Sequence, residues 1–269
     1  MTGERPSEAP RGALADRGAV VTGGGRGIGA AVAWALAEAG AGVVVAARTS
    51  AEIEAVAAAL CDRGGRAWAV GCDVTDERSV ASLGEAARSR LGTVDILVNN
   101  AGVAGSAPFR KISLEEWSRM LSVHATGTFL CTRQFAPAMV ERGWGRVVNV
   151  ASLAGLEGAK YVAHYCAAKH AVVGFTRAVA LELAGSGVTV NALCPGYVDT
   201  PLTERTLAGV QAHAGLPREQ ALAAVLATTG QDRLVTAEEV AAAVLELCFE
   251  PSGEVNGQAI VLKPRGGTP

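Results

Sequence analysis

The chain has 269 residues, of which 49% are hydrophobic and 19% are charged, and its formal net charge is −2. This balance excludes a disordered chain and gives no electrostatic sign of a nucleic-acid partner, and no apolar run reaches the roughly 20 residues of a membrane-spanning helix. Residues 1–14 lack the apolar core of a secretion signal, so we expect them to be a flexible tail on a cytoplasmic protein.

Short apolar segments alternate with longer segments of helical periodicity from residue 18 onward. The expected strands lie at 18–24, 41–47, 66–74, 94–102, 145–152, 187–196 and 258–262. The expected helices lie at 27–39, 50–62, 76–91, 114–142, 164–183 and 236–248. Strands this apolar are typical of a parallel sheet with helices on both faces. We predict one α/β domain over residues 15–269, with a Rossmann-type doubly wound parallel sheet of about seven strands.

Three further features bear on the organisation of the chain. The six cysteines are scattered without a Cys-x-x-Cys pair, which predicts reduced and mostly buried thiols. The histidines at 164, 170 and 213 show no ligand spacing, so we predict no metal site. Residues 197–235 are a looser mixture of small and apolar residues, and we expect them to form a mobile substrate lid.

A glycine-rich segment, Thr22–Gly29 (TGGGRGIG), joins the first expected strand to the first expected helix. The free N–H groups and positive dipole end of a helix N-terminus suit a pyrophosphate, and glycines let the ligand approach the backbone. The spacing G-x3-G-x-G that starts at Gly23 differs from the usual dinucleotide fingerprint, although Gly25, Gly27 and Ala30 fit the form G-x-G-x-x-A. The context favours a dinucleotide site over a turn that only packs helix against strand.

The end of the second expected strand indicates which dinucleotide binds. An acidic residue there would bind a ribose 2′-hydroxyl and favour NAD, but the stretch 46–49 contains none. Arg48 can instead meet a 2′-phosphate, and Arg26 in the glycine loop can join it, so we expect NADP(H) in preference to NAD(H). Asp73 is either an acceptor for the adenine amino group or a helix cap near Asp76.

Tyr165 and Lys169 are four residues apart in an otherwise apolar helix, so they share one face. A lysine in such a helix either reaches the surface, where its stem covers apolar area, or has a specific task. Ser152 lies thirteen residues before Tyr165, at the end of the fifth expected strand. Such a serine could hydrogen-bond a substrate oxygen beside the tyrosine.

Together and in this order, the motifs resemble those of the short-chain dehydrogenase/reductases, over nearly all of the chain from about residue 15. The resemblance rests on the Thr22–Gly29 loop, Asn99-Asn100-Ala101-Gly102, Ser152, Tyr165-x3-Lys169, Asn191 and Pro195-Gly196. It implies a nicotinamide hydride carrier, with Tyr165 as acid or base and Lys169 as its activator. It also implies homodimers or homotetramers, built by packing the helices at roughly 114–142 and 160–184.

The chemistry agrees with those roles. Reducing a ketone needs a proton for the developing alkoxide, and lowering a tyrosine pKa from about 10 to about 7 requires roughly 4 kcal/mol. A lysine cation one turn away, with the oxidised nicotinamide charge, favours the tyrosinate. The residues expected to bind the cofactor are Thr22, Gly23, Gly25, Arg26, Gly27, Ile28, Gly29, Arg48, Asp73, Val74, Asn99, Ala101, Gly102, Tyr165, Lys169, Pro195, Gly196, Val198 and Thr200.

Two positions depart from the family pattern. His124 stands where many relatives have an asparagine that anchors a proton-relay water, and it is either a substitute in that relay or an interior histidine. We expect His124→Asn to preserve or raise turnover. The ending IVLKPRGG replaces the frequent Asp-Gly-Gly, which puts in doubt any subunit contact that the usual ending makes.

The predicted function is NADPH-dependent reduction of a keto group to a secondary alcohol, on a 3-oxoacyl thioester or polyketide intermediate by resemblance. One alternative is an NAD(P)-dependent dehydrogenase that oxidises a cyclic or hydroxyacyl alcohol. An alternative of another class is a dinucleotide-binding sensor or scaffold without catalysis, which the presence of both Tyr165 and Lys169 disfavours. A serine hydrolase is disfavoured because Ser152 lacks the flanking glycines of a nucleophile elbow.

Overall fold

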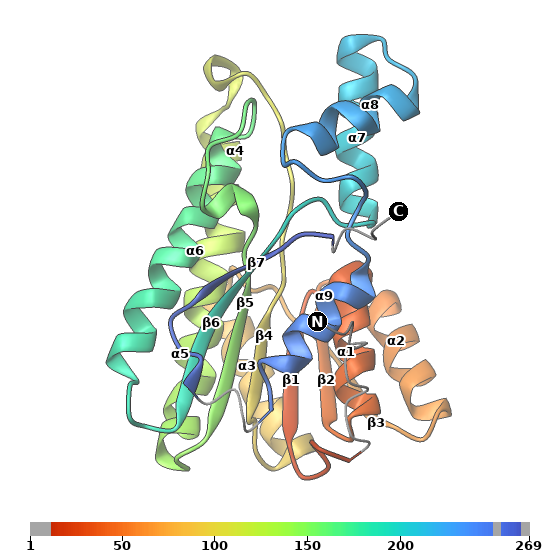
Figure 1. Ribbon diagram of the computed structural model, residues 1–269. Helices are drawn as coiled ribbons and strands as arrows, with labels where there is room; N and C mark the ends of the chain where they lie inside the picture. Colours follow the sequence, from red (N-terminus) through yellow and green to blue (C-terminus); the bar gives the residue numbers. More distant parts are fainter. Residues whose placement is uncertain (1–11, 250–253, 265–269) are drawn as a thin grey trace, which may run out of the picture.

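The computed structural model describes residues 12–249 and 254–264, and within them seven parallel strands form one sheet in the order β3-β2-β1-β4-β5-β6-β7 (Figure 1). The strands are β1 (Gly18–Thr22), β2 (Gly42–Ala47), β3 (Arg66–Gly71), β4 (Ile96–Asn99), β5 (Gly145–Val150), β6 (Val188–Pro195) and β7 (Ala259–Leu262). The strand order reverses between β1 and β4, and such a switch point is where ligands bind in open α/β sheets. The predicted fold class is confirmed.

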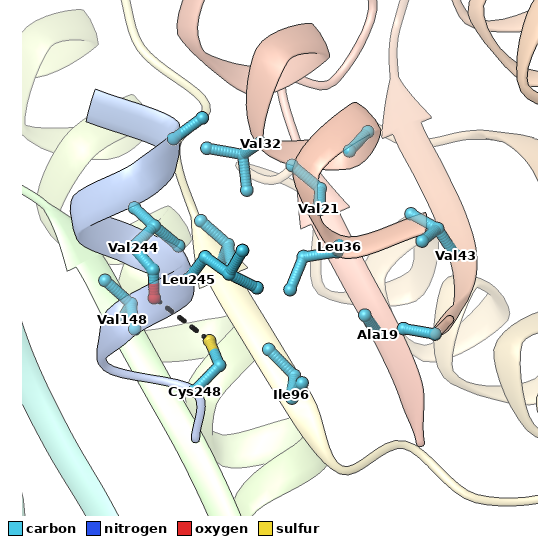
Figure 2. Close-up of a cluster of buried hydrophobic side chains, with 14 of the residues drawn as sticks. Ala19, Val21, Val32, Leu36, Val43, Ile96, Val148, Val244, Leu245 and Cys248 are labelled. Carbon is cyan, nitrogen blue, oxygen red and sulfur yellow. Dashed lines mark hydrogen bonds between the residues drawn. The ribbon is translucent and has the colours of Figure 1, made fainter. Parts of the chain in front are cut away.

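One face of the sheet is covered by α1 (Gly27–Glu38), α2 (Ser50–Asp62) and α9 (Ala237–Glu246). Figure 2 shows the centre of this layer, where Val32 and Leu36 of α1 lie opposite Val244 of α9. Cys248, directly after α9, is buried there and its Sγ donates a hydrogen bond to the Val244 carbonyl at 3.2 Å. Apolar residues on this face fix α1, whose N-terminus holds the glycine loop.

The other face is covered by α3 (Glu77–Leu91), α5 (Gly127–Glu141) and α6 (Ala163–Glu182). Buried side chains from all three helices pack against the central strands, and they include Leu83, Phe135, Met139 and Ala180. Helix α6 therefore lies along β6, and Lys169 in its second turn reaches the carboxyl end of β5 at Val150 (Figure 1).

The helix predicted over 114–142 is interrupted. It consists of α4 (Leu114–Leu121), a π-helical turn (Ser122–Thr126) and α5, and the π turn contains buried His124. A π turn inserts one extra residue into a helix and shifts the direction of its side chains, an arrangement common at functional sites. Short 3-10 turns at Phe109–Lys111 and Leu153–Gly155 shape the loops nearby.

The structure corrects several predicted boundaries. The strands predicted to reach 24, 74, 102 and 152 end earlier, because the residues after Thr22, Gly71, Asn99 and Val150 leave the sheet. The segment 197–235 is largely helical, with α7 (Pro201–Ala214) and α8 (Arg218–Ala227) projecting beyond the sheet (Figure 1).

The predicted N-terminal tail is longer than the structure allows. Leu14 is buried at 2% exposure and its N–H donates to the Ala39 carbonyl at 2.9 Å, so the predicted tail over 1–14 extends too far. Residues 265–267 of the unusual ending lie outside the described residues. Within the described ranges, no helix has the length and apolarity to span a bilayer.

Candidate active site

A cavity of about 350 Å³ opens at the carboxyl ends of the strands. Loops that follow β1 to β6 form its walls, and the start of α7 closes one side. Its lining includes most of the predicted site residues: Gly23, Gly25, Arg26, Gly27, Ile28, Arg48, Asp73, Val74, Ala101, Gly102, Ser152, Tyr165, Lys169, Pro195, Gly196, Val198 and Thr200. The motifs that are far apart in the chain therefore converge at the switch point.

The glycine loop presents the N-terminus of α1 to the cavity. Gly23 and Gly27 have φ values of 64° and 53°, which favour glycine, and Arg26 at the N-cap makes no side-chain cap hydrogen bond. The first N–H groups of α1 therefore have no partner within the helix and remain available to an anion. This cradle fits a dinucleotide pyrophosphate.

Three predicted cofactor residues support the walls instead of lining them: Thr22, Gly29 and Asn99. The Thr22 hydroxyl accepts hydrogen bonds from the N–H groups of Asn100 and Ala101 at 3.0 and 3.1 Å. A side chain at Gly29 would place its Cβ 2.2 Å from the Gly23 carbonyl oxygen, so Gly29 permits close packing of helix on loop.

The Asn-Asn-Ala-Gly turn was expected to hold both the cofactor and the central sheet. In the structure Asn99 bonds within the core, and Asn100 bonds in the cavity wall. The Asn99 amide donates to Asn149 at 2.8 Å and to Thr132 at 3.0 Å, which ties β4 to β5 and α5 inside the core. The Asn100 amide lies in the cavity wall and donates to the carbonyls of Thr22 and Gly23, both at 3.1 Å. Asn100 was missed as a site residue, although the quoted motif contained it.

Arg26 and Arg48, on which the prediction of NADP rests, each have an acidic neighbour. The Arg26 Nη1 lies 2.9 Å from Glu52 Oε1, and the Arg48 Nη1 lies 4.0 Å from Asp73 Oδ2. Burial alone would raise the pKa of Asp73, but hydrogen bonds from Thr75 and the Arg48 charge lower it. No acid stands in the stretch 46–49 at the end of β2, yet Glu52 reaches the same cavity from the first turn of α2.

The two readings of Asp73 are now separated. Asp76 is the cap of α3, because its carboxylate accepts from the Arg78 N–H at 3.0 Å. Asp73 instead lines the cavity, with one oxygen bonded to Thr75 and the other facing Arg48. Asp73 therefore belongs to the cavity wall and does not cap α3.

Ser152, Tyr165 and Lys169 meet in the cavity wall as predicted. The Lys169 ammonium donates to the Val150 carbonyl at 2.7 Å and lies 5.6 Å from the centre of the Tyr165 ring. Ser152 caps the 3-10 turn after β5, with its hydroxyl accepting from the Ala154 N–H at 3.2 Å. The tyrosine and lysine come from the first two turns of α6 and the serine from the loop after β5.

Burial dominates the proton affinities of this group. It raises the pKa of Tyr165 to about 12, against a hydrogen bond with Ser152 that lowers it. It also lowers the pKa of Lys169 to about 8, because the low-dielectric surroundings disfavour the cation. Lys169 was expected to bring the Tyr165 pKa down, but in this arrangement desolvation sets the shift and the lowering contribution comes from Ser152. At neutral pH the phenol therefore holds its proton and the ammonium holds its charge.

His124 is an interior histidine that contacts both Tyr165 and the cavity loop after β4. Its ring meets the Tyr165 ring edge to face, with centroids 5.4 Å apart, and its Nε2 lies 2.8 Å from the Val103 carbonyl. Its exposure is 3%, and burial together with the Lys169 charge holds its pKa well below the usual range. A neutral imidazole that donates to Val103 fits these contacts.

The loop after β6 is held from behind by Gln231. The buried amide of Gln231 accepts from the Tyr197 N–H at 2.7 Å and donates to the Tyr197 carbonyl at 3.1 Å. Val198 pairs with Val235, and Thr200 caps α7, so the residues that follow Tyr197 are also held in place. Gln231 belongs to no motif and was not predicted.

All six cysteines are free, and the described residues contain no cluster of metal ligands.

The sequence matches the short chain dehydrogenase family over residues 17–211. It is 41% identical to cis-4-hydroxycyclohexanecarboxylate dehydrogenase of Sinomonas cyclohexanicum, covering 93% of this chain and 96% of that one. It is 42% identical to 3-oxoacyl-[acyl-carrier-protein] reductase of Synechocystis sp., covering 71% and 78%. The structure matches a variant of actinorhodin polyketide ketoreductase with NADPH at a TM-score of 0.88 and 37% identity, covering 92% and 95%. The chain therefore belongs to the short chain dehydrogenase family, and it is an oxidoreductase that acts on hydroxyl or keto groups.

Proposed function

We propose that this protein is an NADPH-dependent ketoreductase that reduces a keto group to a secondary alcohol. The observation that carries the proposal is the meeting of Ser152, Tyr165 and Lys169 in one wall of the dinucleotide cavity. The preferred substrates are 3-oxoacyl thioesters or polyketide intermediates, which the names of two similar proteins support.

Ser152, Tyr165 and Lys169 each have a separate part in the proposed reaction. When bound, the reduced nicotinamide supplies a hydride to the substrate carbonyl carbon. Ser152 and Tyr165 hold the carbonyl oxygen by hydrogen bonds, and Tyr165 gives its proton to the developing alkoxide. The ammonium of Lys169 stabilises the tyrosinate that this transfer leaves. A phenol whose pKa is raised to about 12 starts the reaction protonated, which suits the reductive direction.

NADP(H) is the proposed cofactor, on the strength of Arg48 and Arg26 in the cavity wall. The guanidinium groups of Arg48, directly after β2, and of Arg26, in the glycine loop, match the charge and geometry of a 2′-phosphate. Arg48 is the better placed of the two, because its acidic neighbour is 4.0 Å away and its side chain is 67% exposed.

A second candidate is a dehydrogenase that oxidises a cyclic alcohol. The 41% identity to a cis-4-hydroxycyclohexanecarboxylate dehydrogenase favours it, and the same three side chains would serve it with Tyr165 as the base. The raised pKa of Tyr165 counts against this direction near neutral pH, because the phenol would first have to lose its proton.

One assay separates the candidates. NADPH and NADH oxidation are followed by absorbance against 3-oxoacyl thioesters and cyclic ketones, and NADP⁺ and NAD⁺ reduction against the matching alcohols. The proposal predicts the highest kcat/KM for NADPH with a 3-oxoacyl thioester. Faster turnover of cyclic alcohols than of every ketone would favour the second candidate, and equal use of NADPH and NADH would remove the cofactor assignment.

We propose a homodimer or homotetramer that packs through α5 and α6. Phe129 of α5 is 41% exposed and stacks edge to face on Phe175 of α6, while Leu181 of α6 is 79% exposed. Exposed apolar residues on two adjacent helices suit a second copy of the chain. Light scattering after gel filtration should give a multiple of 27.3 kDa, and Phe129→Glu should lower the mass. A monomeric wild-type protein would contradict this assembly.

A further inference from the structure

The cavity wall contains an ion pair that takes no part in the proposed transfer of hydride and proton. Arg26, in the glycine loop, and Glu52, in the first turn of α2, form an ion pair of 2.9 Å. Their side chains are 55% and 33% exposed, and both line the dinucleotide cavity. The two residues are 26 positions apart, so the pair joins the loop after β1 to the helix after β2.

Glu52 lies close to the place where a 2′-phosphate has to bind. A Cβ added to Gly25 would lie 2.8 Å from the Glu52 Cβ and 3.3 Å from its Oε2, so the carboxylate covers the side of the glycine loop. Thr49, the N-cap of α2, makes no side-chain cap hydrogen bond, and the helix N-terminus there attracts negative charge. The Glu52 carboxylate therefore lies at a helix N-terminus that would also attract an anionic ligand.

The charges at this end of the cavity balance one another. The Arg48 guanidinium lies 4.0 Å from the Asp73 carboxylate, whereas the Arg26 guanidinium is in direct contact with Glu52 at 2.9 Å. A guanidinium that already binds a carboxylate must exchange that partner before it can bind a phosphate. Because the pair is partly exposed, this exchange has a modest free-energy cost, and it weakens phosphate binding without preventing it.

We infer that Glu52 sets the selectivity between the two nicotinamide dinucleotides by holding Arg26 away from the 2′-phosphate, which leaves Arg48 as the main phosphate contact. The inference rests on the proposed use of NADP(H), and it makes Glu52 a positioning residue that acts through Arg26. NADP(H) is preferred in the wild-type protein because of Arg48, and the preference is limited because of Glu52.

The test is equilibrium binding of NADP⁺ and NAD⁺ by calorimetry, which needs no turnover. Glu52→Gln removes the carboxylate charge and keeps the side-chain size, so it should increase the ratio of the NAD⁺ to the NADP⁺ dissociation constant by about two- to fivefold. The change should come from tighter NADP⁺ binding, with NAD⁺ binding nearly constant. Higher salt should reduce the gain, because screening weakens contacts between exposed charges.

Two comparisons make the result specific. Glu54→Gln removes the same charge from an exposed position on the same helix, outside the cavity wall, and should leave the ratio unchanged. Arg26→Gln should cancel the effect, so that adding Glu52→Gln to it changes nothing further. An unchanged ratio in Glu52→Gln, or an equal increase with and without Arg26, would overturn the inference.

The affinities of the wild-type protein test the proposed NADP(H) assignment independently of the role of Glu52. A wild-type protein that binds NAD⁺ more tightly than NADP⁺ would reject the NADP(H) assignment, whatever the variants show. A wild-type preference for NADP⁺ with no response to Glu52→Gln would keep the assignment and reject the role of Glu52.

Discussion

The Lys169 ammonium lies 5.6 Å from the centre of the Tyr165 ring, and its nearest hydrogen-bond acceptor is the carbonyl of Val150. The bond to Val150 anchors the lysine to the end of β5 and holds its charge beside the phenol. With an exposure of 5%, Lys169 acts in surroundings that strengthen its interaction with a tyrosinate. The central site thus consists of a protonated acid beside a fixed positive charge.

The pH dependence of reduction should follow Lys169. The ammonium must be charged, and burial lowers the pKa of Lys169 to about 8, so activity is full below that pH and falls as the pH rises through it. The phenol does not contribute to this fall, because the pKa of Tyr165 is about 12. The quantity to measure is kcat/KM for NADPH, which reports the pKa values of the free enzyme.

Lys169→Arg provides the matched control for that profile. Arginine stays protonated across the accessible range, so the remaining activity of the variant should lack the alkaline fall. If the fall stays at the same pH in the variant, another group is responsible and the role given to Lys169 is wrong.

Gln231 should matter for stability and for cofactor binding together. Gln231→Ala leaves the Tyr197 N–H without its acceptor and should lower the free energy of unfolding by about 1–3 kcal/mol. The same change frees the loop after β6, so the dissociation constant of NADP⁺ should rise. Urea unfolding and calorimetry measure the two effects.

An exposed glutamine offers a control for this substitution. Gln258 donates only to the Asn256 carbonyl from its exposed side chain, and Gln258→Ala should change neither quantity appreciably. Equal effects of the two substitutions would show that Gln231 has no special part in holding the loop.

The glycine loop should tolerate no side chain at Gly29. A Cβ there would lie 2.2 Å from the Gly23 carbonyl oxygen and 2.5 Å from the Asn100 amide nitrogen, so Gly29→Ala should cost about 1–3 kcal/mol and weaken cofactor binding. Gly209→Ala, in α7 where nothing lies within 4 Å, should instead stabilise the protein by about 0.5–1 kcal/mol. Thermal unfolding of both variants checks the contrast, and a Gly29→Ala protein as stable as the wild type would refute the packing account.

The sequence predicted the fold, and the convergence of Ser152, Tyr165 and Lys169 on one cavity, because both have short-range signals. Apolar runs separated by helical periodicity identify a covered parallel sheet, and the spacing of Tyr165 and Lys169 places them on one helix face. The strand ends were less accurate, because a residue such as Ala151 continues an apolar run after the chain has left the sheet. Periodicity does not distinguish a ladder residue from the cavity wall that follows it.

The missed residues depend on contacts between distant segments. Glu52 reads as an ordinary first-turn helix acid until the fold brings it to Arg26, and Gln231 lies in a segment without any motif. The helices α7 and α8 were taken for a looser region because their many small residues give weak periodicity. The π turn around His124 has no pattern of its own, since the residues before and after it both favour helix.

The most direct test of the account is the rate of NADPH oxidation by Tyr165→Phe with the best ketone, measured beside its NADP⁺ dissociation constant. The substitution removes the proton donor and keeps the ring that packs on His124. The account predicts a loss of about 10²–10⁴-fold in turnover, with NADP⁺ binding nearly unchanged. A variant that reduces the ketone as fast as the wild-type enzyme would show that the proton comes from elsewhere and would contradict the mechanism.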